Sequence, residues 1–147
     1  MSLKEKLADD LKSAMKNKDI VRKNVVQMVR AGVLQIEKDK KITLDDEGVL
    51  DVIAKQLKQR RDSLPDYEKS GREDLISELK SEMDVLMEYL PKQLTHEELE
   101  AIVKEAVEKT GASSMKDMGK IMAEVMPKTK GRADGKEINQ IAKSLLS

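Results

Sequence analysis

Cysteine, phenylalanine and tryptophan are absent from the 147 residues, and His96 is the single histidine. Without cysteine the chain can form no disulfide and offers no thiolate to a metal, and one histidine leaves too few ligands for a zinc site. We therefore expect a reducing, cytoplasmic location and neither a metal nor another cofactor. The sequence also lacks any run close to the roughly 18 uncharged apolar residues of a membrane span, so we expect no membrane partner.

Aromatic residues are limited to Tyr67 and Tyr89, so the core has to be built from aliphatic side chains and the nine methionines. A chain with so few aromatic rings has no platform on which unpaired bases could stack. Sequence-specific reading of single-stranded RNA is therefore improbable. Any RNA would be held through its shape and its phosphates.

Helix caps and apolar spacing predict an all-α fold that begins with a four-helix unit. Ser2 opens a capping box with Glu5, and Thr43 is expected to cap the third helix. Pro65 predicts a kink or a fresh start within that third helix. The expected helices run from residue 3 to about 17, from 20 to about 39, from 44 to about 70 and from 73 to 89.

Pro91 forbids continuation of the fourth helix, and the remaining residues predict a small three-helix unit. Thr95, Ser114 and Asp134 are the expected N-caps, and Gly111 is the expected stop of the first of these helices. We therefore divide the chain into an N-terminal helical domain, residues 1–92, and a C-terminal three-helix domain, residues 93–147.

The most unusual segment is the glycine-bearing basic run from Gly131 to Glu137. Glycines at a helix N-terminus let backbone amides converge on an anion, but the spacing is not that of a P-loop, and Asp134 can occupy those amides itself. A well-capped turn and an RNA-phosphate contact are equally good interpretations. The RNA interpretation uses the basic side chains of this part of the chain: Lys120, Lys128, Lys130, Arg132 and Lys136.

Other polar and apolar patterns have simpler explanations. His96 follows a cap and has no neighbouring nucleophile, so we expect a surface histidine. Glu78 and Glu82 could share a cation but more often mark a solvated helix face. The methionines at 115, 118, 122 and 126 form a stripe that we expect in the core, with an adaptable partner groove as the alternative. We identify no catalytic residue.

Four segments together resemble the GatB/YqeY family, that is, stand-alone YqeY-like proteins and the C-terminal tail of the B subunit of tRNA-dependent amidotransferase. They are Arg72-Glu73-Asp74-Leu75, residues 89–94, Met118-Gly119-Lys120-Ile121-Met122 and Gly131-Arg132-Ala133-Asp134-Gly135-Lys136. The resemblance implies tRNA or another structured RNA as partner, together with translation-related proteins.

Three functions follow in order of preference. The first is an adaptor that binds tRNA or its processing machinery, and the second is a protein-protein interaction module. The third, implied by the resemblance alone, is a carbon-nitrogen ligase that uses glutamine as amido donor and acts only with other subunits. No stand-alone catalysis is expected, because we recognise neither a nucleotide loop nor a nucleophile-base pair.

Overall fold

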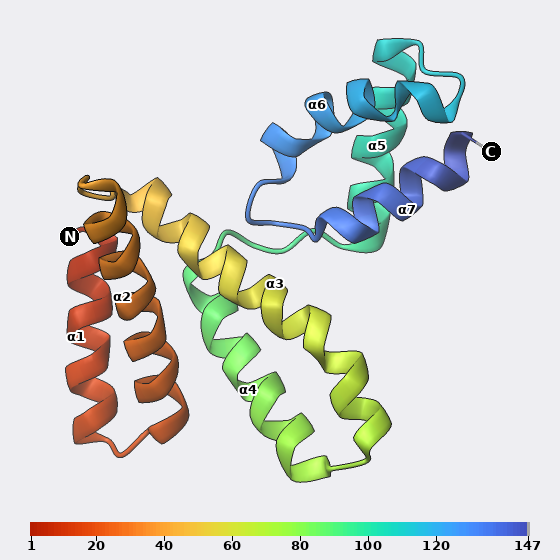
Figure 1. The fold of residues 1–147 in the computed structure, drawn as a ribbon. Helices are drawn as coiled ribbons and strands as arrows, with labels where there is room; N and C mark the ends of the chain where they lie inside the picture. The colour runs from red at the N-terminus through yellow and green to blue at the C-terminus, as the bar shows by residue number, and fades with distance from the viewer. Residues whose placement is uncertain (147) are drawn as a thin grey trace. The chain divides into compact units, whose positions relative to one another are not determined.

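The structure is a computed structural model that describes residues 1–146, and in that part every regular element is a helix. The all-α prediction is confirmed. The chain forms two compact units, Met1–Leu90 and Pro91–Ser147. The first contains α1 (Leu3–Lys16), α2 (Ile20–Lys40), α3 (Asp46–Ser70) and α4 (Glu73–Tyr89), and the second contains α5 (His96–Thr110), the 3-10 turn η1 (Met115–Asp117), α6 (Met118–Thr129) and α7 (Gly135–Leu146) (Figure 1).

Unit 1 consists of two antiparallel helix pairs, α1 with α2 and α3 with α4 (Figure 1). Its core is aliphatic, as the composition requires, and is centred on Val25, Ile53 and Leu86, each fully buried. Gly32 allows α2 and α3 to approach closely, since a Cβ there would lie 3.0 Å from Val52 Cγ1. Burial of these branched side chains stabilises the unit by roughly 1.5–3 kcal/mol each.

The caps fix where most helices begin. Ser2 forms the predicted capping box with Glu5, and the Thr95 hydroxyl accepts a hydrogen bond from the Glu98 amide at 3.1 Å. The prediction of Thr43 as the third cap is wrong, because Asp45 accepts from the Gly48 amide at 2.8 Å. A carboxylate is at least as good a cap as a threonine hydroxyl, and α3 starts at Asp46 as a result.

Two prolines lie inside helices without ending them. Pro65 lies inside α3, which continues to Ser70, and Pro127 lies inside α6. A proline in a helix interior removes one hydrogen bond and crowds the preceding turn. Packing of α3 along α4 outweighs that local cost, so the fresh start, one of the two outcomes predicted at Pro65, does not occur.

Unit 2 packs α5, α6 and α7 around Val103, Ile121, Val125 and Ile138, all of which are fully or almost fully buried. The stop at Gly111 is confirmed by its left-handed backbone, with φ of 67°. Ser114 caps the short turn η1, and Asp117 is the N-cap position of α6. Among residues 1–146, no helix is long and apolar enough to cross a membrane.

Candidate functional site

The basic loop between α6 and α7 is held in place by the segment that precedes α5. The Leu94 amide donates to the Arg132 carbonyl at 2.8 Å, and the Gln93 side chain donates to the Gly131 carbonyl at 2.8 Å. The Arg132 amide closes the turn on the Thr129 carbonyl, also at 2.8 Å. The loop backbone is thus fixed by bonds to residues about forty positions earlier, and no local sequence pattern predicts this role of Gln93.

The five predicted RNA-binding side chains all belong to unit 2, but they are not equivalent. Lys120, Lys128, Lys130 and Lys136 are exposed, whereas Arg132 is partly buried and its Nε donates to the Lys92 carbonyl at 3.3 Å. Lys120 also lies 3.8 Å from the carboxylate of Asp117. Arg132 therefore helps to hold the loop in position, in addition to carrying a charge that a ligand could contact. RNA binding by these residues stays a prediction.

Asp134 takes the place that an anion would need at the start of α7. Its carboxylate accepts from the Lys136 amide at 3.0 Å, and its carbonyl accepts from the Glu137 amide at 3.1 Å. Gly131 has a φ of 73° and is required by the turn, because side chains rarely tolerate that conformation. This arrangement supports contact with phosphates through side chains and not through a backbone nest.

A groove of about 580 Å³ lies beside the loop, between the start of α5 and one face of α7. His96 is 61% exposed, as expected for a surface residue, and its Nδ1 lies 3.0 Å from the Glu137 carboxylate and its Nε2 3.9 Å from that of Glu100. The hydrogen bond to Glu137 raises the pKa of His96, and the nearby carboxylates add to that effect. Among the described residues, no cluster of ligating side chains could hold a metal ion.

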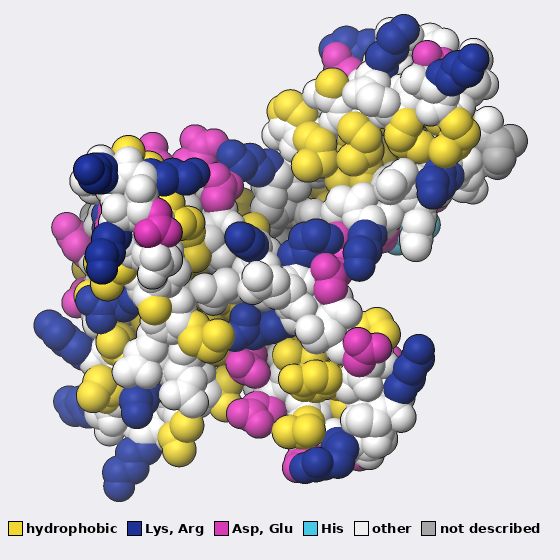
Figure 2. Space-filling view, viewed as in Figure 1, with side chains coloured by type: hydrophobic (Ala, Val, Ile, Leu, Met, Phe, Trp, Pro, Cys, Tyr) yellow, Lys and Arg dark blue, Asp and Glu magenta, His cyan; other side chains and the backbone are white. Residues whose placement is uncertain are grey.

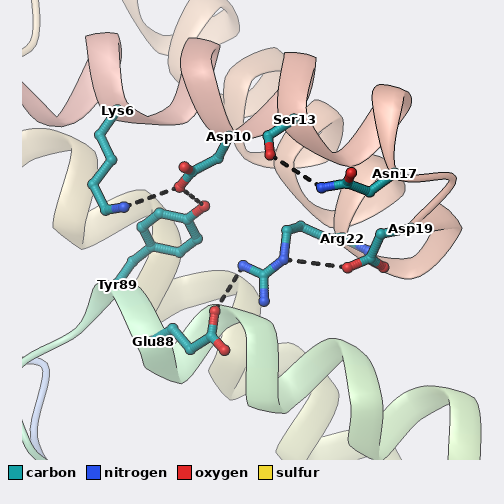
Figure 3. A network of polar contacts seen from close by, with 8 residues as sticks. All are labelled: Lys6, Asp10, Ser13, Asn17, Asp19, Arg22, Glu88 and Tyr89. Atoms are coloured by element: carbon teal, nitrogen blue, oxygen red, sulfur yellow. Dashed lines mark hydrogen bonds and ion pairs between the residues drawn. The ribbon is translucent and has the colours of Figure 1, made fainter.

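Unit 1 contains a separate polar network where α1, α2 and α4 meet (Figure 3). The buried Tyr89 donates its phenol to Asp10, which Lys6 also approaches at 3.2 Å, and Arg22 reaches Glu88 at 2.7 Å. Burial and the bond to Asp10 raise the pKa of Tyr89. The network ties the end of α4 to the first two helices, so we assign it a structural role.

Two sequence interpretations need revision. Glu82 is not simply part of a solvated face, because it lies 3.2 Å from the guanidinium of Arg60, a buried side chain of α3. The methionine stripe is divided, since Met118 and Met122 pack against the core while Met115 and Met126 remain 48% and 46% exposed. Periodicity alone could not show either result, because both depend on which neighbouring helix covers each face.

These features define a small all-helical protein of two units, with a braced basic loop in the second. The chain belongs to the family of YqeY-like proteins, whose family model matches residues 4–146. The part of the predicted resemblance that concerns this family is confirmed.

Curated relatives share this similarity and carry one name, "Altered inheritance of mitochondria protein 41, mitochondrial". The protein from Pyrenophora tritici-repentis is 30% identical over 87% of this chain and 71% of its own length. The protein from Vanderwaltozyma polyspora is 33% identical over 76% and 64%, and the one from Kluyveromyces lactis is 40% identical over 56% and 45%. The chain thus spans between 45% and 71% of the length of these relatives.

The predicted cytoplasmic location is contradicted by these names, which are those of mitochondrial proteins. The physical reason for the error is simple. Absence of cysteine removes disulfides from consideration but does not distinguish one reducing compartment from another.

Proposed function

We propose that this protein is an adaptor that binds structured RNA, with tRNA as the first candidate, through the basic loop of unit 2. The observation that carries the proposal is the fixed backbone of that loop. Bonds from Gln93 and Leu94 hold the backbone of Gly131 and Arg132 in place. Little backbone entropy is therefore lost when the lysines around them meet phosphates.

Two further arguments support RNA over a small anion. The backbone amides at the start of α7 are engaged by Asp134, which leaves side-chain cations as the means of contact. The loop also resembles the tail of the tRNA-dependent amidotransferase B subunit, which contributes tRNA contact in that enzyme. Since contacts to phosphates carry no sequence information, we expect binding with little sequence preference.

A ligase role is a weaker proposal. In the resembled amidotransferase the chemistry belongs to a separate catalytic domain, so amide formation from glutamine would need other subunits. The His96 ring contacts the carboxylates of Glu100 and Glu137, and neither is a hydroxyl that it could activate as a nucleophile.

The test is a salt titration of binding to folded tRNA, beginning with mitochondrial tRNAs because the matched relatives are named as mitochondrial proteins. We expect the logarithm of the affinity to fall linearly with the logarithm of salt concentration. Replacing Lys130 and Lys136, the exposed lysines at the two ends of the loop, together with Gln should reduce the magnitude of that slope by about two, one for each lost phosphate contact. These two lysines are preferred to Arg132, whose loss would also disturb the loop.

The matched control replaces Lys12 and Lys55, two exposed lysines of unit 1, with Gln. It removes the same charge from the chain and should leave the slope unchanged. Equal slopes for the loop variant and the parent would refute the proposal. An equal loss in both variants would show that net charge, and not the loop, governs binding.

A further inference from the structure

Helix α6 carries an apolar surface that the core of unit 2 does not cover. Ile121 and Val125 form its buried side, and next to them lie Met122, partly buried, and the exposed Gly119, Ala123 and Met126. Positions 119, 122, 123 and 126 share one face because residues three and four apart are neighbours on a helix. We call these four residues, with Met115 from the preceding turn, the α6 apolar face.

The space-filling view shows hydrophobic side chains gathered across the surface of unit 2 in the region of α6 and α7 (Figure 2). Within the α6 apolar face, Met115 and Met126 keep almost half of their surface in solvent. Methionine is flexible and polarizable, which suits a surface that has to fit a partner of irregular shape.

Gly119 has no explanation within the chain. It lies in a helix with ordinary backbone angles, and a Cβ built on it would meet nothing within 4 Å. Glycine in the middle of a helix costs roughly 0.5–1 kcal/mol relative to alanine, and Gly119 is the second residue of α6. A glycine that neither a turn nor an internal neighbour requires leaves a notch into which the backbone of another helix can settle closely.

The charges beside the face indicate what kind of helix would fit. Lys116 and Lys120 border it, and both are exposed. Of the acidic residues of the same stretch, Glu124 pairs with Lys109 at 3.3 Å, and Asp117 accepts from the Ser113 amide at 3.0 Å while lying 3.8 Å from Lys120, so this edge keeps a net positive charge. A partner with carboxylates along this edge would gain charge complementarity.

We propose that the α6 apolar face docks an amphipathic helix of another protein, with its apolar side over Gly119 and its acidic edge against Lys116 and Lys120. This interaction goes beyond the proposed RNA binding and uses a different surface, with Lys120 at the border of both.

The probe is a designed amphipathic peptide about 18 residues long, long enough to form a helix, with leucines on one face and glutamates along its edges. Binding to the full-length chain is followed by NMR of the methionine methyl groups. We expect saturable shifts at Met115, Met122 and Met126, and none at Met15 or Met28 of unit 1, which are also exposed. A twin peptide with lysines in place of the glutamates should bind about tenfold more weakly.

Substitution at Gly119 tests the notch. Gly119→Leu projects a side chain into open space, so the fold should keep its melting temperature while peptide affinity drops by about tenfold or more. Gly119→Ala fills only part of the notch, so we expect it to weaken binding less than Gly119→Leu does. Exchange of Lys116 and Lys120 for Glu should reverse the preference between the acidic and the basic peptide.

Several results would overturn the proposal. The face does not dock such a helix if no saturable shift occurs up to about 1 mM peptide, if Met15 and Met28 shift equally, or if Gly119→Leu binds like the parent. Shifts of the same methyl groups on dilution of the protein alone would assign the face to a second copy of the chain. Shifts on adding tRNA that Gly119→Leu abolishes would assign it to RNA.

Discussion

At the scale of single residues, His96 offers the clearest measurement because it is the only histidine. Its bond to Glu137 raises its pKa above 6.5. The proton is therefore held more tightly in the folded state, and the stability that it contributes is complete below about pH 6.5 and disappears as the pH rises through the folded pKa.

We accordingly predict that the free energy of unfolding of unit 2 declines as the pH rises from about 6.5. An NMR titration of the His96 ring gives its pKa directly, and Glu137→Gln should lower that pKa toward 6.5 and flatten the stability profile. Glu97→Gln is the control and should act weakly, because Glu97 contributes the least of the three carboxylates. A pKa that Glu137→Gln leaves unchanged would contradict the assigned hydrogen bond.

At the scale of helices, the position of Pro65 leads to a prediction about the stability of unit 1. The residue is exposed within α3, so Pro65→Ala should lose no packing and restore one helical hydrogen bond. We expect the free energy of unfolding of unit 1 to rise by about 1–3 kcal/mol, measured by chemical denaturation. Lys69→Ala, at another exposed position of the same helix, should have little effect. An unchanged or lower stability in Pro65→Ala would mean that packing requires the proline backbone.

Helix positions were largely predictable from the sequence, whereas the surroundings of several side chains were not. Capping by Ser2 and Thr95 and the stop at Gly111 rest on contacts within four residues, so the sequence contains the whole signal. Continuation through Pro65 and the pairing of Arg60 with Glu82 depend on α4 lying beside α3. The attachment of the basic loop to Gln93 and Leu94 joins segments far apart in the sequence, which no local pattern reveals.

At the scale of the whole molecule, the division into two units leads to a prediction about folding. The two hydrophobic cores contain no common residue: one lies within residues 1–90 and the other within residues 91–147. We expect each segment, expressed alone, to be helical by circular dichroism and to melt cooperatively. Calorimetry of the full chain should then resolve two transitions at the temperatures of the isolated segments.

Unit 2 is the less certain of the two to fold alone, because a segment of this size buries only about 60% of the surface that its unfolded chain exposes. If residues 91–147 are unfolded alone but helical in the full chain, the second unit is not an independent domain. A single calorimetric transition in the full chain would lead to the same conclusion.

The position of Tyr89 also has a practical consequence. Both tyrosines lie in unit 1, and the chain has no tryptophan, so all of its intrinsic ultraviolet fluorescence comes from that unit. Unit 2 emits nothing but carries the only imidazole. A ligand confined to the basic loop or the α6 apolar face should therefore leave the emission unaltered. A change in tyrosine emission on adding RNA, after correction for the ultraviolet absorption of the RNA itself, would report that Tyr67 or Tyr89, in the other unit, responds to the encounter.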